Sequence, residues 1–232
     1  MKKSFQIFLL LITFLTPFLL ITSGMRTALL PIFVNVEYKL PNFPPDTFGF
    51  TTEERLIWAN YSIRYLLGKV SDDEFSILQF SDGTPLFNER EISHMIDVRD
   101  LTIVMLNIWQ VLILFFTIVL FLGWRYKWLH DLLCALENGA KITLAVIMAI
   151  FVYVWINFIQ LFTLFHQIFF EGESWLFYLS DTLIRLFPIK FWQDLFIFIG
   201  SFGILTGLLL IILGRLVNKK MKHGIDLSFY LN

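Results

Sequence analysis

Residues 101–123 read LTIVMLNIWQVLILFFTIVLFLG, an apolar run without a charged side chain. A helix needs roughly 20 such residues to cross a hydrocarbon core of about 30 Å. Three other stretches are as long: Phe5–Gly24, Lys141–Phe165 and Trp192–Gly214. The chain is 57% hydrophobic and has 27 Phe among 232 residues, which excludes an ordinary soluble domain. The sequence therefore predicts an all-α polytopic membrane protein with four transmembrane helices.

The first apolar stretch follows Lys2 and Lys3, as the core of a secretory signal would. It is longer than a usual signal core, however, and no small-x-small cleavage pattern follows it. We therefore expect residues 1–24 to stay in place as the first transmembrane helix.

The distribution of charge predicts the orientation. Cations are dense in three places, at Lys2, Lys3, Arg125, Lys127, Lys219, Lys220 and Lys222. By the positive-inside rule both termini, the loop 124–140 and the tail 216–232 are cytoplasmic. The segment 25–87 is then an extracellular cap, and 168–191 is an extracellular amphipathic loop before the last helix, 192–215. Acidic residues gather in these outer segments, so the net charge of -1 is uninformative and we expect no nucleic-acid partner.

The only cysteine, Cys134, falls in the predicted cytoplasmic loop. The outer segments therefore have neither a disulfide nor a thiol nucleophile.

The cap carries local folding signals and is predicted to be a small α+β unit. Thr51 with Glu54, and Ser71 with Glu74, are capping-box pairs that predict two helices. The turn Ser81–Thr84, which contains Asp-Gly, predicts a β-hairpin between 77–80 and 85–87. The Pro-rich stretch Pro41–Pro45 predicts a loop.

Two histidines are predicted to meet at one membrane surface. Asn88 can cap a helix whose third residue is Glu91, so the second transmembrane helix should extend over 88–123. His94 then lies about 10 Å outward of Leu101, at 1.5 Å per residue. The third helix, 141–167, uses roughly 20 residues in the hydrocarbon core. This count places His166 just outside the core, on the same side and at the same depth as His94.

Paired imidazoles at this depth suit acyl chemistry on a lipid, because ester linkages lie there and a free imidazole, with a pKa near 6.5, is a usable base. The substrate would enter laterally from the bilayer. Arg90, Glu91 and Asp97 share the helical face of His94 at spacings of three and four, so they can orient its ring or meet a substrate amine. Asp97 is the favoured orienting partner.

Simpler interpretations compete with this one. Either histidine alone is more often an interfacial anchor, and a Glu-Arg-Glu-x-x-His run is usually a solvated face worth under about 1 kcal/mol. The matching depth of His94 and His166 favours a site, whereas His130 and His223 lie among predicted cytoplasmic cations.

Other chemistries have weaker signals. Glu91, His94 and His166 could ligate a metal, but the sequence has no His-Glu-x-x-His motif and no second carboxylate-histidine pair. The outer serines, Ser93, Ser174 and Ser180, lie in no Gly-x-Ser-x-Gly elbow. Asn157 and Gln160 could line a transport path, but the apolar stretches hold few ionisable groups, which disfavours a transporter.

Two runs in this topology resemble a known family. They are Glu89–Val98 (EREISHMIDV) and Phe165–Phe170 (FHQIFF), the second followed by Trp175 and Asp181. The chain resembles, over essentially its whole length, the lipoprotein intramolecular transacylases, small four-span membrane proteins of Gram-positive bacteria. The cap is the part that matches least well.

The resemblance implies an enzyme that moves the sn-2 acyl chain of a diacylglyceryl lipoprotein to the α-amine of its N-terminal cysteine, giving an N-acylated lyso-lipoprotein. It implies no cofactor, a catalytic pair of His94 and His166, and Trp175 and Asp181 as substrate-binding residues. It leaves open which histidine is the base. The alternative is a non-catalytic membrane module whose cap docks an envelope partner or a lipid.

Overall fold

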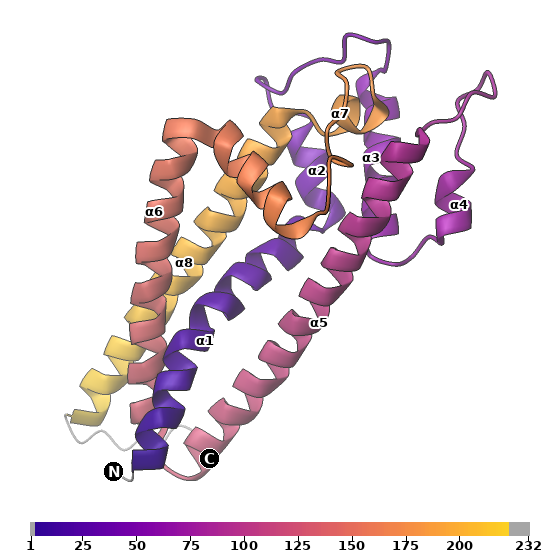
Figure 1. Ribbon diagram of the computed structural model, residues 1–232. Coiled ribbons are helices and arrows are strands. Elements are labelled where there is room, and N and C mark those ends of the chain that lie inside the picture. The colour runs from indigo at the N-terminus through magenta and orange to yellow at the C-terminus, as the bar shows by residue number, and fades with distance from the viewer. Residues whose placement is uncertain (1–2, 223–232) are drawn as a thin grey trace. The chain divides into compact units, whose positions relative to one another are not determined.

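The computed structural model describes residues 3–222, and these residues form helices joined by loops (Figure 1). The helices are α1 (Lys3–Ala28), α2 (Pro31–Glu37), α3 (Thr52–Leu66), α4 (Asp72–Ser76), α5 (Glu89–Arg125), α6 (Leu129–Phe169), α7 (Thr182–Leu186) and α8 (Ile189–Lys222). Within the described part, 4 helices, α1, α5, α6 and α8, are long and apolar enough to cross a membrane. The prediction of a four-span, all-helical membrane protein is confirmed.

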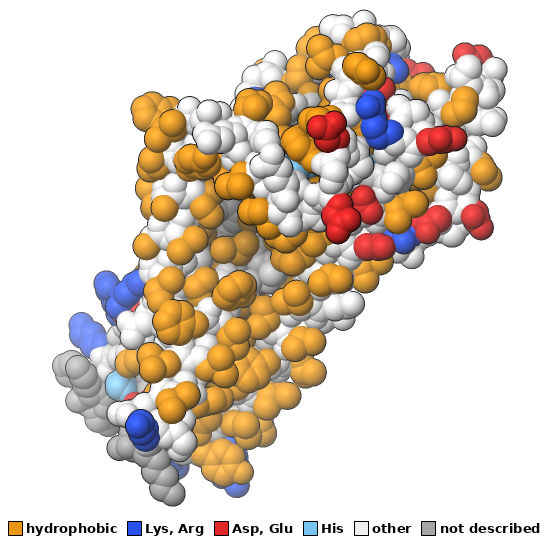
Figure 2. Space-filling view, in the orientation of Figure 1, with side chains coloured by type: hydrophobic (Ala, Val, Ile, Leu, Met, Phe, Trp, Pro, Cys, Tyr) orange, Lys and Arg blue, Asp and Glu red, His pale blue; other side chains and the backbone are white. Residues whose placement is uncertain are grey.

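Exposed apolar side chains cover the long helices, and Figure 2 shows them spread over the visible faces. Phe14 is 61% exposed, Val111 66% and Leu205 68%. Surfaces of this kind are costly in water and suit lipid, so the protein is a multi-pass membrane protein.

The chain divides into two compact units. Unit 1 comprises the described residues of Met1–Gly24, Ile108–Phe151 and Ile199–Asn232, and unit 2 comprises Met25–Asn107 and Val152–Phe198. Nearly all acidic residues of the sequence fall in the ranges of unit 2.

Unit 1 has a core to which the first part of α6 contributes. Leu132, Ala135, Leu136 and Ala140 are buried, and the first three pack with Ile12 and Phe116. Their spacing is that of one helical face, which explains why α6 starts at Leu129 rather than at the expected Lys141. Residues 129–140, expected in a loop, are therefore helical.

The predicted helices of the cap are confirmed in unit 2. Thr51 caps α3 and Ser71 caps α4, each in a reciprocal capping box with the glutamate three residues later. Behind them the Tyr65 and Phe75 rings stack at 4.1 Å, and Phe75 stacks on Phe87 at 4.7 Å. The cap thus has an aromatic core of its own.

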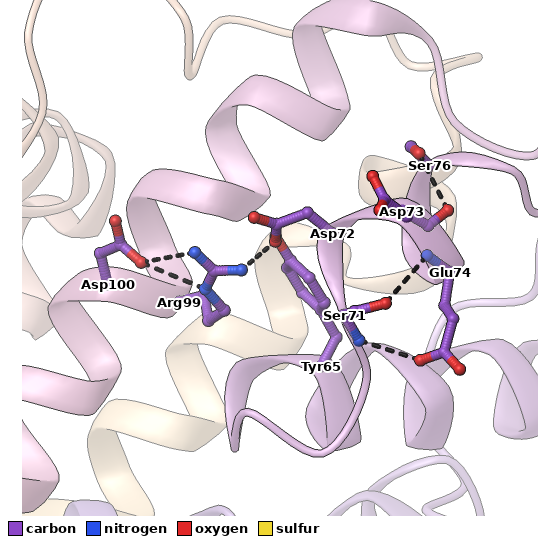
Figure 3. A network of polar contacts seen from close by, with 8 residues as sticks. All are labelled: Tyr65, Ser71, Asp72, Asp73, Glu74, Ser76, Arg99 and Asp100. Carbon is purple, nitrogen blue, oxygen red and sulfur yellow. Dashed lines mark hydrogen bonds and ion pairs between the residues drawn. The ribbon is translucent and has the colours of Figure 1, made fainter.

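Arg99 links α5 to this cap through the network in Figure 3. Its guanidinium pairs with Asp72 at the start of α4 and with Asp100 at 2.8 Å. The Tyr65 hydroxyl donates to the same Asp72 carboxylate at 2.7 Å. The network holds α3, α4 and α5 together.

The predicted β-hairpin is wrong, since residues 3–222 contain no strand and the cap is not α+β. The Asp-Gly turn forms, with Gly83 at φ 83°, but the segments on either side of it make only an isolated antiparallel bridge, between Gln79 and Pro85. Two segments this short gain little from pairing alone. Instead Leu86 and Phe87 are buried in the core of unit 2.

Polar contacts join α2 to α7 and α8 within unit 2. The Tyr38 hydroxyl donates to the Leu186 carbonyl, and the Glu37 carboxyl lies beside the Asp194 carboxyl. Burial and then this second carboxyl raise the pKa of Glu37 to about 7, because both disfavour its charged form. The Glu37 carboxyl therefore stays largely protonated up to near-neutral pH.

Helix α6 is broken at Asn157, whose φ of -157° and ψ of 82° are not helical. Asn157 Oδ1 accepts a hydrogen bond from the Gln160 amide at 3.1 Å and so caps the helical segment that follows. These two polar residues, considered above for a transport path, form a helix start.

Gly139 lies at a close approach to the backbone of α1 in unit 1, and its substitution tests this packing. A Cβ there would lie 2.6 Å from the Thr13 carbonyl oxygen. We expect Gly139→Ala to destabilise the protein by about 1–3 kcal/mol through overpacking against backbone. Gly207→Ala is the control, because its Cβ would meet nothing closer than 3.7 Å and Ala favours helix by up to about 1 kcal/mol. The melting temperature of the detergent-solubilised protein should fall for the first variant only, and equal shifts would contradict the packing.

Candidate active site

The site is built from the start of α5, the second part of α6 and the loop before α7, all within unit 2. Asn88 and Glu91 fix the start of α5 as predicted, since Asn88 Oδ1 accepts from the Glu91 amide at 3.0 Å and Glu91 Oε2 from the Asn88 amide at 2.8 Å. His94 follows on the next turn. It is 7% exposed.

His166 lies in the segment of α6 that Asn157 caps, and it is 6% exposed. Its Nδ1 lies 2.8 Å from the Phe162 carbonyl oxygen, one turn earlier. Because a carbonyl only accepts, Nδ1 carries the hydrogen and donates it. Nε2 therefore keeps its lone pair and is the basic nitrogen of this ring.

The two imidazoles come together, with ring centroids 5.8 Å apart and planes inclined by 24°. The predicted depth of His166 assumed a straight helix from Lys141. Helix α6 is broken at Asn157, so the rise per residue does not fix that depth.

Five aromatic rings surround the imidazoles and are here called the aromatic cage: Phe162, Phe165, Phe170, Trp175 and Phe177. Phe170 contacts both imidazoles, at 4.9 Å from His94 and 5.4 Å from His166. A cage of rings excludes water and strengthens electrostatic interactions inside it.

Several polar atoms in and beside the cage are buried without a hydrogen-bond partner among the described residues. They are His94 Nδ1, Ser174 Oγ, Trp175 Nε1 and Arg90 Nε. The Trp175 ring lies 4.9 Å from His166. Buried polar groups are normally paired, so unpaired atoms around two imidazoles indicate a site built for a polar ligand group.

The loop before α7 is tied to α5 by Asp181 and Arg90. Their ion pair measures 2.9 Å, and Asp181 also accepts from the Tyr178 amide at 2.8 Å. The Arg90 guanidinium lies over the Phe177 ring at 5.4 Å. These residues, expected to support the site or bind substrate, thus join the loop that carries Trp175 to the start of α5.

Glu91 and Asp97 do not contact the imidazoles in the expected way. Glu91 is 1% exposed, and its Oε1 accepts from the Leu183 amide at 2.7 Å. Asp97 is exposed, and no hydrogen bond among the described residues joins it to His94. The carboxylate that positions the site is therefore Glu91, which acts through the backbone of α7.

Sequence reasoning missed most of the aromatic cage. Phe162 and Phe170 stand four residues before and after His166, so helical spacing could have identified both. Phe177 comes from an irregular loop, for which no periodic signal exists. Among residues 3–222, no group of three or more His, Cys, Asp or Glu could bind a metal ion.

The fold and the site together define a four-span helical membrane protein that buries paired imidazoles among aromatic rings. Residues 8–192 match the family Lipoprotein intramolecular transacylase Lit. The chain therefore belongs to the lipoprotein intramolecular transacylase family, as the two sequence runs indicated. The family consists of membrane transacylases that act on lipoproteins.

Individual proteins are similar to this chain over most of its length. An uncharacterized protein of Aquifex aeolicus (strain VF5) is 29% identical over 213 residues, which cover 92% of this chain and 95% of that protein. The solved structure of the lipoprotein intramolecular transacylase Lit from Bacillus cereus has a TM-score of 0.69 at 18% identity, over 96% of this chain and 100% of that chain. A variant of the Bacillus protein gives 0.65 at 20% identity, over 96% and 97%. These structures share the fold.

The Asp181 contacts predict an effect on the loop before α7. Asp181→Asn removes the ion pair with Arg90 and one acceptor, so we expect amides in 174–183 to exchange about 5–30-fold faster, which corresponds to roughly 1–2 kcal/mol. Hydrogen–deuterium exchange measures this directly. Asp73→Asn, at an exposed residue of α4, is the control, and equal exchange in both variants would mean that Asp181 does not hold the loop.

Proposed function

We propose that this protein moves the sn-2 acyl chain of a diacylglyceryl-modified lipoprotein to the α-amine of its N-terminal cysteine. The observation that carries the proposal is the buried His94–His166 pair in a chain of this family. The product is an N-acylated lyso-lipoprotein.

The reaction is balanced within one molecule. The amine nitrogen attacks the ester carbonyl and loses one proton, the ester C–O bond breaks, and the departing glyceryl oxygen gains one proton. An amide and an alcohol result, without water, oxidant or a second substrate. Two proton transfers are thus the chemistry that side chains must supply, and two imidazoles are suited to them.

His166 is the proposed base. Its Nδ1 donates to the Phe162 carbonyl, which orients the ring and leaves Nε2 available for the amine proton. His94, whose Nδ1 has no partner among the described residues, is then the proposed second group, which serves the departing glyceryl oxygen.

Trp175 and Ser174 are the proposed donors to the carbonyl oxygen as negative charge develops on it. Their buried Nε1–H and hydroxyl have no partner among the described residues, and the Trp175 ring contacts His166. Preorganised donors in a site that excludes water stabilise such charge strongly.

The protein is proposed to work at the outer surface of the membrane, on a substrate that enters from the bilayer. The positive-inside rule supports cytoplasmic termini and an active site at the extracellular interface. The apolar aromatic cage supports lateral entry of a lipidated substrate, whose acyl chains never need to leave the bilayer. Folding donor and acceptor of one molecule into attack geometry would supply part of the rate.

The histidine pair gives the decisive test of this function. His94→Ala and His166→Ala should each lower acyl transfer by about 10²–10⁴-fold, the usual contribution of general acid–base catalysis. Mass spectrometry of the N-terminal lipopeptide from a co-expressed reporter lipoprotein measures it. His130→Ala is the control, because that side chain lies beside Asp131 in unit 1. Unchanged lipopeptide with the wild-type protein would instead support a non-catalytic membrane module.

The Trp175→Phe variant tests whether Trp175 acts as a hydrogen-bond donor or only packs against the substrate. Trp175→Phe keeps an aromatic ring against His166 but removes the indole N–H, so kcat should fall by about 10²–10³-fold with KM nearly unchanged. Trp58→Phe, in α3 of the cap, is the matched control. A change in KM alone would assign Trp175 to substrate packing.

A further inference from the structure

Unit 2 has a cavity of about 220 Å³ whose lining residues include neither histidine of the pair nor any ring of the aromatic cage. It lies where the end of α1 and the start of α2 face α3 and the turn after it. Its lining residues are Arg26, Leu29, Leu30, Pro31, Asn60, Ile63, Arg64, Leu67 and Lys69. Three of these are cations, several are apolar, and none of these described lining residues is acidic.

A specific backbone turn brings two of the cations to this cavity. After α3, Gly68 adopts a φ of 68°, the left-handed conformation that glycine favours. The Gly68 amide donates to the Tyr65 carbonyl at 2.9 Å, and the Lys69 amide donates to the Arg64 carbonyl at 2.9 Å. This is the hydrogen-bond pattern of a Schellman motif, and it sets Arg64 and Lys69 on the same side of the helix end.

The helix dipole explains only part of this arrangement. Cations in the last turn of a helix are favourable by about 0.3–1 kcal/mol each, and Arg26 and Arg64 occupy the last turns of α1 and α3. Lys69 lies beyond the end of α3, and the dipole does not account for a cavity that collects all three. A cluster of like charges is stabilised by an anion that it binds.

The position of α1 in the membrane indicates which anion is at hand. Its 26 residues span about 39 Å at 1.5 Å per residue, which exceeds a hydrocarbon core of about 30 Å. Because a charged side chain is costly inside that core, we expect Arg26, near the end of α1, at the level of the lipid headgroups. Leu30 is 39% exposed beside it, and Leu29 and Leu67 are half-buried. Cations over an apolar wall match a phosphate joined to acyl chains.

We propose that this cavity binds the headgroup phosphate of an anionic phospholipid through Arg26, Arg64 and Lys69, with the glycerol and upper acyl segments against the leucines. The site is separate from the proposed acyl-transfer chemistry and does not depend on it. It would fasten the cap to one leaflet and favour membranes that contain anionic lipid.

The test uses the full-length protein in detergent with acyl-labelled phosphatidylglycerol and phosphatidylcholine as probes. The wild-type protein should bind phosphatidylglycerol at least 10-fold more tightly. The variant Arg26→Gln/Arg64→Gln/Lys69→Gln should lose this preference, whereas Lys39→Gln, an exposed cation outside the cavity, should keep it. A triple variant that retains the preference overturns the proposal.

Two further binding measurements complete the test. If the triple variant does not fold, Lys69→Gln alone decides, because Lys69 is exposed; its affinity for phosphatidylglycerol should fall about 3-fold, and an unchanged affinity overturns the proposal. Inorganic phosphate at 10 mM, added as a competitor, should displace little labelled lipid. Complete displacement would assign the cavity to free phosphate and overturn a lipid site.

Discussion

The buried carboxylate of Glu91 joins the start of α5 to the first turn of α7. One oxygen accepts from the Asn88 amide and starts α5, and the other accepts from the Leu183 amide in the first turn of α7. His94 depends on the first bond and the loop that carries Trp175 on the second. The carboxylate is 1% exposed, so no water would replace a partner that it lost. Losing either hydrogen bond would therefore leave a buried oxygen unpaired.

A second constraint acts on His166 from within its own helix. The break at Asn157 leaves amides without the carbonyls of the preceding turn, and the Asn157 side chain satisfies one of them at Gln160. The helical segment that starts there carries Phe162, whose carbonyl fixes the tautomer of His166. The proposed base thus depends on a broken helix, as irregular backbone in membrane proteins often occurs next to function.

The sequence predicted the features that depend on neighbouring residues. The caps at Thr51, Ser71 and Asn88 follow from spacings of three, and the four spans follow from apolar length. The Asp-Gly turn formed, but the paired segments are too short to make strands, and Leu86 and Phe87 are buried in the core of unit 2. Asp97 was predicted to position the site, whereas Glu91 makes the buried contact. Both stand three residues from His94, and only the position of α7 distinguishes them. The sequence next to Asn157 contains no proline or glycine that would predict the break in α6.

The balance of apolar and polar groups in the site follows from the proposed substrate. Acyl chains gain nothing from hydrogen bonds, so phenyl rings suffice to enclose them. The reacting ester and amine need few polar partners, and the buried groups without partners among the described residues include polar groups of the kind they need, on His94, Ser174 and Trp175. Each would cost free energy while unpaired. The proposed acyl-transfer reaction would regain that energy when these atoms meet the ester and the charge that develops on it.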